Sequence, residues 1–280
     1  MSGTLPNFLI IGAMKAGTTS LYHYLRSHPE VFMPEEKEIH FFNRDQDWEL
    51  GAPWYERFFE DAGEAIAVGE ASPGYAMYPH RRRVPERIAS LVPDVRLVYV
   101  IRHPIERMRS HYAHFLVSGR DVLPINDELV VNPLYLDMSR YALQIEQYLE
   151  HFDQGQLLIV LSEDLRHHRT ATMHTVFSHL GVEPEFSVPT GEFHRTSEKR
   201  KRTRFGTYLQ RLPGYELARR TLPEGTRKSL YRTITAPAAD PSAIEILPET
   251  MEALEDELKD DVKRLHEYLS RADFDGWGIA

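Results

Sequence analysis

Residues 7–21 form the stretch that most constrains the fold of this chain. Residues 8–11 are a short, uninterrupted apolar run, which is typical of a strand covered on both faces in a parallel sheet. Gly12 and Gly17 enclose four residues, and a loop bounded by glycines can wrap closely around a ligand. Residues 18–20, Thr-Thr-Ser, then begin a helix. Because the N-terminus of a helix attracts anions, the stretch predicts a strand–loop–helix unit that binds an anion.

The loop differs from the common nucleotide-phosphate loop in the position of its lysine. That loop has the pattern G-x-x-x-x-G-K-[ST], with the lysine on the β- and γ-phosphates and the next hydroxyl on Mg²⁺. Here Thr18 stands where that lysine would be, and Lys15 lies inside the loop. The pattern therefore favours a bound anion over a triphosphate with its metal, and we expect no metal site. Taken alone, the stretch is also compatible with a simple turn that carries a lysine by chance.

Composition excludes several classes of function. The 280 residues suffice for one large α/β domain or two small ones. A net charge of −9 argues against a nucleic-acid partner, so an anionic ligand must be held by local basic groups. The sequence has no cysteine, which excludes disulfides, thiolate metal ligands and a cysteine nucleophile. Without a basic leader or a long apolar run near its start, the chain is expected to be soluble and cytoplasmic, with no membrane insertion.

Apolar runs of strand length alternate with amphipathic helical segments along the chain. After the first unit, strands are expected at 65–70, 95–101 and 156–161, and helices at 54–59, 84–91, 105–115, 139–152, 170–180 and 247–269. Residues 121–137 lack clear periodicity and are expected to form a long surface connection. With no internal repeat and no linker, the alternation predicts one three-layer α/β domain over residues 1–280. Its central parallel sheet would have helices on both faces.

A carboxylate and an imidazole follow the first unit. Glu38 and His40 alternate with Ile39 and Phe41, so in an extended segment both polar side chains would point to one face. Such a pair, close in sequence to an anion-binding loop, is a candidate for proton transfer. The pattern leaves open which of the two is the base.

Further basic residues are candidates for anion binding. Arg102 directly follows the clearest expected strand, where a phosphate partner is favoured over a structural ion pair. Ser110 lies two helical turns further along. Residues 194–204 form the dense basic run of the sequence, with Lys199 and Arg200 at its centre. This run is interpreted either as a solvated loop or as a lid that closes on the same anion.

Three ordered motifs resemble those of sulfotransferases that use 3′-phosphoadenosine 5′-phosphosulfate (PAPS). Residues 15–21 are similar to the family's 5′-phosphosulfate loop, and residues 98–112 are similar to its 3′-phosphate motif. Residues 38–42 resemble the base-bearing segment of the heparan-sulfate sulfotransferase branch, and residues 265–277 resemble the end of its chains. The resemblance covers most of the chain and implies a fold like that of the P-loop nucleoside-triphosphate hydrolases, with PAPS as donor and no metal.

The resemblance also implies a role for each matching residue. Lys15 would stabilise the phosphate leaving group. Glu38 would accept the proton of the acceptor, with His40 as its partner or as a substitute base. The residues implied to hold the donor are Lys15, Ala16, Gly17, Thr18, Thr19 and Ser20 at the 5′-phosphate, Arg102 and Ser110 at the 3′-phosphate, and Lys199 and Arg200 in the basic run.

The acceptor is less well defined than the donor. The heparan branch often has a lysine after its strand-end glutamate, whereas Glu70 is followed here by Ala71, and a disulfide-closed loop is missing. The acceptor is therefore left open between a carbohydrate and a small molecule, a lipid or a peptide, and between a hydroxyl and an amine. Four aromatic residues either line its pocket or belong to the core: Phe41, Phe42, Trp54 and Tyr75.

Two other functions compete with sulfuryl transfer. An ATP-dependent kinase would use a similar loop, but the displaced lysine and the missing metal-binding hydroxyl argue against it. A non-catalytic nucleotide-binding module is the other alternative. Glu38 and His40 argue against that module, because simple binding needs no base.

Overall fold

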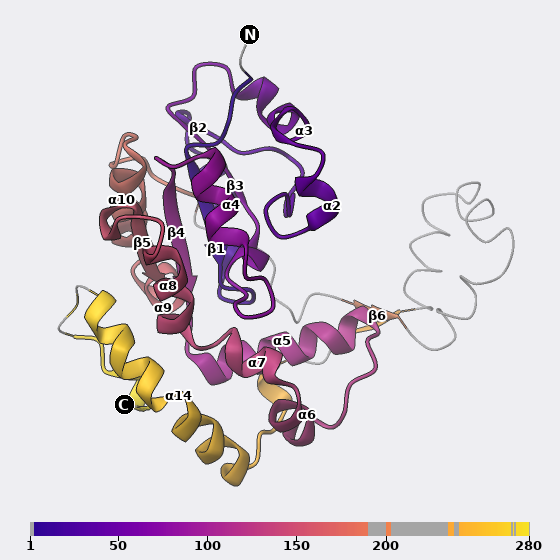
Figure 1. The fold of residues 1–280 in the computed structure, drawn as a ribbon. Helices are drawn as coiled ribbons and strands as arrows, with labels where there is room; N and C mark the ends of the chain where they lie inside the picture. Colours follow the sequence, from indigo (N-terminus) through magenta and orange to yellow (C-terminus); the bar gives the residue numbers. More distant parts are fainter. Residues whose placement is uncertain are drawn as a thin grey trace, which may run out of the picture.

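A five-stranded parallel sheet lies at the centre of the protein, with helices packed around it (Figure 1). The structure is a computed structural model and describes residues 3–189, 200–202, 235–237, 241–269, 271 and 273–279. The strand order is β2-β3-β1-β4-β5. The strands are β1 (Phe8–Gly12), β2 (Val31–Phe32), β3 (Ala67–Ala71), β4 (Arg96–Ile101) and β5 (Leu157–Leu161). This architecture confirms the predicted α/β class.

The helices follow the predicted alternation closely. Their bounds are α1 (Thr18–Arg26), α2 (Asp45–Trp48), α3 (Ala52–Glu56), α4 (Val84–Leu91), α5 (Pro104–Ser118), α6 (Ile125–Val131), α7 (Pro133–Asp137), α8 (Tyr141–Leu149), α9 (Ser162–His167), α10 (Arg169–Leu180) and α14 (Pro248–Tyr268). A short antiparallel ribbon pairs β6 (Arg200–Arg202) with β7 (Thr235–Pro237). No helix in the described ranges is long and apolar enough to cross a membrane.

Residues 121–137 differ from the prediction because they contain α6 and α7. Each of these helices has at most two turns, which is too short for a helical period to stand out in the sequence. Their apolar residues, among them Ile125, Leu129 and Tyr135, join a second core with residues of α5 and α14. Packing against helices distant in sequence therefore supplies the stability that local periodicity does not indicate.

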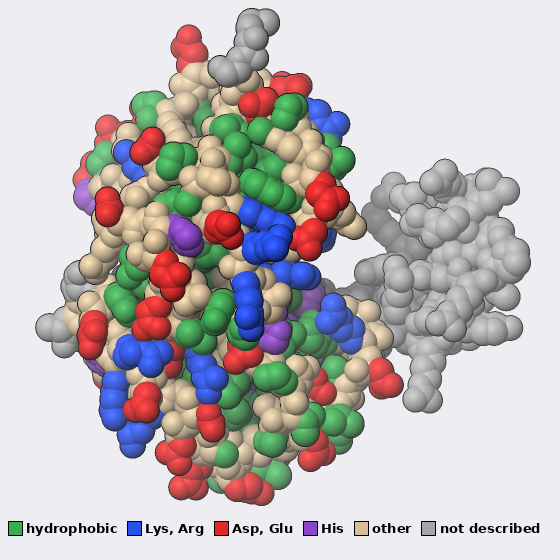
Figure 2. Space-filling model, viewed as in Figure 1, with side chains coloured by type: hydrophobic (Ala, Val, Ile, Leu, Met, Phe, Trp, Pro, Cys, Tyr) green, Lys and Arg blue, Asp and Glu red, His purple; other side chains and the backbone are tan. Residues whose placement is uncertain are grey.

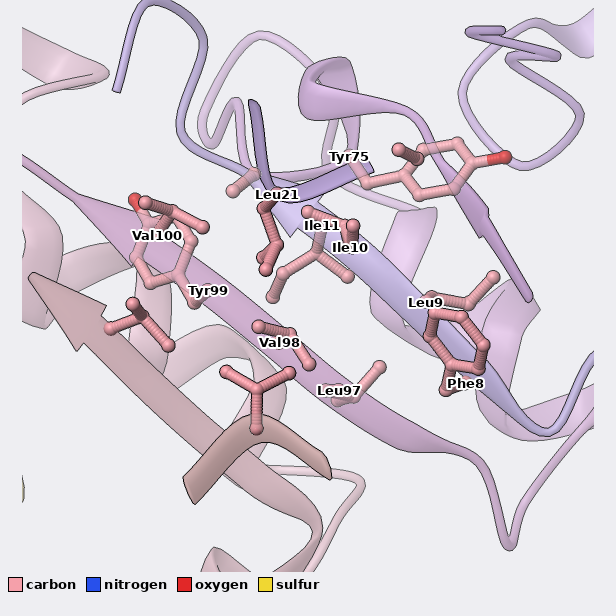
Figure 3. Close-up of a cluster of buried hydrophobic side chains, with 14 of the residues drawn as sticks. Phe8, Leu9, Ile10, Ile11, Leu21, Tyr75, Leu97, Val98, Tyr99 and Val100 are labelled. Carbon is pink, nitrogen blue, oxygen red and sulfur yellow. The ribbon is translucent and has the colours of Figure 1, made fainter. Parts of the chain in front are cut away.

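The main core forms around the two central strands. All five residues of β1 are buried, and Phe8, Leu9 and Ile10 are fully covered. Figure 3 shows these side chains beside those of β4, which include Leu97 and Val98. Complete burial of one such side chain contributes about 1.5–3 kcal/mol, which explains why these apolar runs form the inner strands.

The parallel arrangement brings the carboxyl ends of the strands to one edge of the sheet. Ligands of open α/β sheets bind beyond this edge. The loop that follows β1, the polar turn after β3 and Arg102 after β4 all begin there. The sheet thus places the loop after β1 and Arg102, both predicted to hold the donor, at the same edge, and His40 reaches this edge through the hydrogen bond from its backbone N–H to Ser72 Oγ in the turn after β3.

Candidate active site

The loop between β1 and α1 is shaped to hold an anion. Lys15 and Gly17 have left-handed backbone angles, with φ of 73° and 105°. Gly17 has to be a glycine, because its φ is positive and a Cβ would lie 3.3 Å from Ser162 Oγ. Gly17 precedes α1 without a side-chain cap, and the first turn of α1 has no acidic residue. In this stretch the N–H of Ala16 donates to the carbonyl oxygen of Ala13 (3.1 Å) and that of Ser20 donates to the carbonyl oxygen of Gly17 (3.0 Å), so the N–H groups available to an anionic ligand are those of residues 17–19.

A second lysine reaches this loop from another segment. Lys37 Nζ lies 2.5 Å from Thr19 Oγ1 and 5.6 Å from the centre of the Tyr22 ring. Tyr22 also donates a hydrogen bond of 2.7 Å to the carbonyl oxygen of Pro34, which fixes the segment on α1. Sequence reasoning missed Lys37. Its position directly before Glu38 was the available signal.

Glu38 and His40 lie side by side, but the predicted extended segment is wrong. Both residues have positive φ, 64° and 63°. Glu38 Oε2 nevertheless lies 3.7 Å from His40 Nε2. Glu38 is half exposed, whereas His40 is mostly covered. Two left-handed residues therefore achieve the grouping that was expected from strand alternation.

The hydrogen-bond network assigns the proton of His40. Asn43 Nδ2 donates to the carbonyl oxygen of Gly74 at 2.9 Å and lies 3.3 Å from His40 Nδ1. Because the amide NH₂ faces this side, Nδ1 acts as the acceptor and the proton of the neutral ring is on Nε2, which faces Glu38. Burial, helped by Arg44, lowers the pKa of His40 from its ordinary value, which favours this neutral form. His40 is thus arranged to donate toward Glu38 rather than to accept a proton from an acceptor.

A buried carboxylate, Glu70, stands behind this pair. It accepts hydrogen bonds from Tyr55 (3.1 Å), Tyr75 (2.5 Å) and Ser72 (2.7 Å), and Ser72 Oγ also accepts from the backbone N–H of His40 (3.1 Å). Burial raises the pKa of Glu70 to about 7, although the three hydroxyls oppose this rise. Glu70 was not among the predicted site residues. A carboxylate that ends an apolar strand was the signal for it.

Glu70 is expected to make the stability of the protein depend on pH. Its folded-state pKa of about 7 lies above the ordinary 4.5, so the folded protein retains a proton that the unfolded chain releases between these values. Its contribution is fully present below pH ~4.5 and is lost as the pH rises through 7, by about 3 kcal/mol at most. Glu70→Gln should remove this slope. Urea unfolding of both proteins from pH 4.5 to 7.5 tests this, and parallel stability curves would contradict it.

Arg102 and Ser110 occupy the segment predicted to hold a second phosphate. Arg102 is partly covered, and its Nη2 lies 3.5 Å from Glu106 Oε2. Burial lowers the pKa of its guanidinium, and Glu106 opposes that effect. Ser110 is buried in α5. The backbone N–H of His103, just before α5, already donates to Glu163 Oε1 (3.0 Å) and is not available to a ligand. A phosphate bound here would therefore depend on side chains such as that of Arg102.

The basic run is only partly described. Arg200 begins β6, which lies close to α5 (Figure 1). Lys199 lies outside the described residues. The role of this run as a lid stays a prediction.

The aromatic residues belong to the core rather than to a pocket. Phe41, Phe42 and Tyr75 are almost fully buried, and Phe41 stacks on Tyr55 with ring centres 4.3 Å apart. Trp54 is partly buried and packs against this core. The segment that follows His40 is therefore anchored by its aromatic side chains, which helps to hold Glu38 and His40 in place.

Basic side chains gather on one face of the molecule. Figure 2 shows several Lys, Arg and His side chains in the middle of this face, with acidic side chains around them.

An apolar groove of about 820 Å³ lies along β5, between α8, α10 and the end of α14. None of the predicted site residues lines this groove, so we do not assign the chemistry to it.

Comparison with families and curated proteins points to one kind of enzyme. Residues 5–209 match the family model described as "Sulfotransferase domain". The chain is 32% identical over 206 residues to the bifunctional heparan sulfate N-deacetylase/N-sulfotransferase 4 of Mus musculus, and the matched region covers 65% of this chain and 23% of that protein. It is 31% identical over 191 residues to heparan sulfate glucosamine 3-O-sulfotransferase 3A1 of Mus musculus, with 65% and 47% covered. The chain thus spans less than half the length of these relatives.

Solved structures show the same likeness. The sulfotransferase from Alicyclobacillus acidocaldarius superposes with a TM-score of 0.70 at 25% identity, covering 98% of this chain and 99% of that one. The sulfotransferase domain of the curacin biosynthetic pathway has a TM-score of 0.50 at 18% identity, covering 69% and 82%. This second likeness concerns the fold alone.

Proposed function

The chain belongs to the sulfotransferase family, and on that premise we propose that it transfers a sulfuryl group from PAPS to a hydroxyl or amine of an acceptor. The relatives named for heparan sulfate favour a carbohydrate as that acceptor, with a small molecule as the other class. The family match does not favour the alternatives of an ATP-dependent kinase or a non-catalytic nucleotide-binding module.

One observation carries the assignment of the reacting residues. Among the described residues, four that are not glycine have positive φ, and three of these are Lys15, Glu38 and His40. Such backbone conformations cost on the order of 1–3 kcal/mol each and cluster at functional sites. Sequence motifs and backbone strain are independent signals, and Lys15, Glu38 and His40 each carry both.

Lys15 and the start of α1 are proposed to serve the leaving group. As the acceptor atom attacks sulfur, the bond from sulfur to the bridging oxygen breaks and negative charge develops on the departing phosphate. The Lys15 ammonium and the N–H group of Gly17 would stabilise this charge, with the hydroxyls of residues 18–20 around the same phosphate. The N–H of Ala16, which was also expected to take part, donates instead to the carbonyl oxygen of Ala13 (3.1 Å). Lys37, at Thr19, would add a second cation to this site.

Glu38 is proposed to accept the proton of the acceptor during this attack. Its carboxylate is accessible, whereas the neutral His40 faces it through Nε2–H. We therefore assign His40 as a positioning residue that orients Glu38. Two hydrogen bonds, from Ser72 Oγ to Glu70 and from the backbone N–H of His40 to Ser72 Oγ, hold the same segment against the end of β3.

A transfer assay with two labelled donors tests the proposed function. The protein is incubated with sulfur-labelled PAPS or with γ-phosphate-labelled ATP, together with heparan-type oligosaccharides, simple alcohols, phenols and amines. We expect label from PAPS on at least one acceptor and none from ATP. Transfer from ATP alone would favour a kinase, and nucleotide binding without transfer to any acceptor would favour a binding module.

Arg102 is expected to distinguish the 3′-phosphate of the donor. Hydrogen bonds to charged groups contribute roughly 1.5–3 kcal/mol each, and about 1.4 kcal/mol is tenfold. Two such contacts, from Arg102 and Ser110, should make adenosine 3′,5′-bisphosphate bind at least about 100-fold more tightly than 5′-AMP. Arg102→Ala should remove most of this preference and leave 5′-AMP binding nearly unchanged. Calorimetric titration of both nucleotides measures it.

Arg57→Ala is a suitable control for the loss of one positive charge. Arg57 lies over the Trp54 ring, and its Nε donates to the carbonyl oxygen of Trp54 at 3.2 Å, so its contacts are with α3 and not with the residues predicted to hold the donor. It should leave the preference for the bisphosphate intact. Equal affinity of the unmodified protein for the two nucleotides would argue against PAPS as donor.

A further inference from the structure

Arg107 in α5 is a completely buried cation surrounded by neutral groups. It is 0% exposed. Its Nε donates to Ser139 Oγ at 2.7 Å, and its Nη2 donates to the carbonyl oxygen of Tyr135 at 2.6 Å. Its Nη1 lies 3.4 Å from the carbonyl oxygen of Met14 and 3.4 Å from His111 Nδ1. None of these partners carries a negative charge.

His111, the nearest titratable partner of Arg107, is neutral. Burial, with Arg107 as the next cause, lowers the pKa of His111 to about 2, so its imidazole adds neither a second positive charge nor a negative counter-charge. Burial lowers the pKa of the Arg107 guanidinium, and burial also raises the pKa values of Tyr99, Tyr135 and Tyr141, so these tyrosines stay neutral and supply no counter-charge. Among the described residues, no carboxylate forms an ion pair with Arg107.

The position of Arg107 connects the two predicted phosphate sites. Its contact at Met14 is on the residue directly before Lys15, within the loop after β1. The same helix carries Ser110 one turn later, and Arg102 lies just before the start of this helix, where its carbonyl oxygen accepts a hydrogen bond from the Tyr141 hydroxyl (2.6 Å). Through its contact at Met14 and its place in α5, Arg107 therefore joins the loop that carries Lys15 to the segment that carries Arg102.

A buried charge without a counter-charge is unfavourable, and proteins normally pair it. An anionic ligand beside the loop would relieve this cost, and the positive potential would strengthen its binding because the low-dielectric interior screens it poorly. The forked guanidinium of Arg107 also acts on the loop itself. It donates to the carbonyl oxygen of Met14, and this contact holds the backbone that presents Lys15 in its left-handed conformation.

We propose that Arg107 is the buried counter-charge of the donor's phosphate groups and the residue that positions Lys15, without itself touching the donor; this rests on the proposed function. The charge of Arg107 would support binding, and its fork would support turnover. These two contributions can be separated, because Lys keeps the charge and loses the fork, whereas Met loses both at similar length.

The experiment compares Arg107→Met, Arg107→Lys and the unmodified protein in titrations with adenosine 3′,5′-bisphosphate and with uncharged adenosine. Arg107→Met should weaken bisphosphate binding on the order of 10-fold, as expected for a unit charge several ångströms away at an effective dielectric constant of about 20. Adenosine binding should change little. Arg107→Lys should retain the affinity for the bisphosphate but lower kcat at saturating PAPS, because the carbonyl of Met14 loses its donor.

Ser139→Ala is the matched control for a merely structural role. It removes the acceptor of Arg107 Nε, and the bond from Ser139 Oγ to the carbonyl oxygen of Tyr135, without changing any charge. It should lower the thermal stability of the protein while the ratio of bisphosphate to adenosine affinity stays as in the unmodified protein.

The outcomes separate this proposal from the proposed function. If the unmodified protein does not prefer the bisphosphate over adenosine, the proposed function fails. If it does, and Arg107→Met keeps the same ratio, the counter-charge is overturned. Should Arg107→Met not fold, Arg107→Lys decides. If this variant loses the preference for the bisphosphate over adenosine although it keeps the charge, the role of Arg107 as counter-charge is overturned. If its kcat is unchanged, the role of Arg107 in positioning Lys15 is overturned.

Discussion

Glu38→Gln is expected to lower kcat by about 100- to 10 000-fold, the usual contribution of a positioned general base. Gln keeps the shape of the side chain and its position beside His40, but it cannot accept the proton of the acceptor. Since Glu38 is half exposed, the folded protein should keep its stability. Steady-state kinetics with saturating PAPS measures the loss, and circular dichroism checks the fold.

His40→Ala is the informative comparison for this prediction. A residue that only orients Glu38 should cost less than the base itself, so we expect a clearly smaller loss of kcat than in Glu38→Gln. The lowered pKa of His40 and the acceptor role of its Nδ1 support this order. A much larger loss in His40→Ala would exchange the two roles, and near-normal turnover in Glu38→Gln would contradict the assignment of the base.

Lys15→Ala is expected to lower kcat by about 100- to 1000-fold. Its ammonium would stabilise charge that develops on the bridging oxygen only as the sulfur bond breaks, so the loss belongs to turnover more than to donor binding. Pre-steady-state measurement of a single transfer separates the two effects. The first turn of α1 and Lys37 remain in the variant, and they should retain much of the affinity for the donor.

Lys263→Ala serves as the control for Lys15. Lys263 is an exposed lysine of α14 that pairs only loosely with Asp260, at 3.8 Å. Its loss should not change kcat. If Lys15→Ala keeps near-normal turnover with a normal fold, Lys15 has a structural role and the proposed chemistry has to move to Lys37.

The local sequence predicted the elements that carry the site. The apolar run of β1, the glycine at position 17 and the hydroxyl residues at the start of α1 form one continuous stretch, so neighbouring residues alone indicate its geometry. The helix predicted over residues 170–180 likewise corresponds to α10, which ends before Gly181, a residue with a φ of 74°. Helices α6 and α7 were missed, because their short length hides the period and their stability comes from α5 and α14.

Within the site, the sequence identified residues better than it identified their geometry. Glu38 and His40 were predicted to share one face, and they do, but through left-handed backbone angles that strand alternation does not describe. The aromatic residues were left open between pocket and core. Only packing decides this, and Phe41 and Phe42 are enclosed by residues from α3 and the turn after β3.

The amino-acid sequence by itself determined the α/β alternation, the glycine-bounded loop before α1 and the motifs that predict an anion site there, because these depend on side chains close together in the chain. The tertiary structure decided which groups became buried and which met across the fold. Lys37 reaches Thr19 over 18 positions, and Arg107 reaches Met14 over 93. The buried charge of Arg107 and the raised pKa of Glu70 arise only when distant segments exclude water from them, which no local pattern encodes.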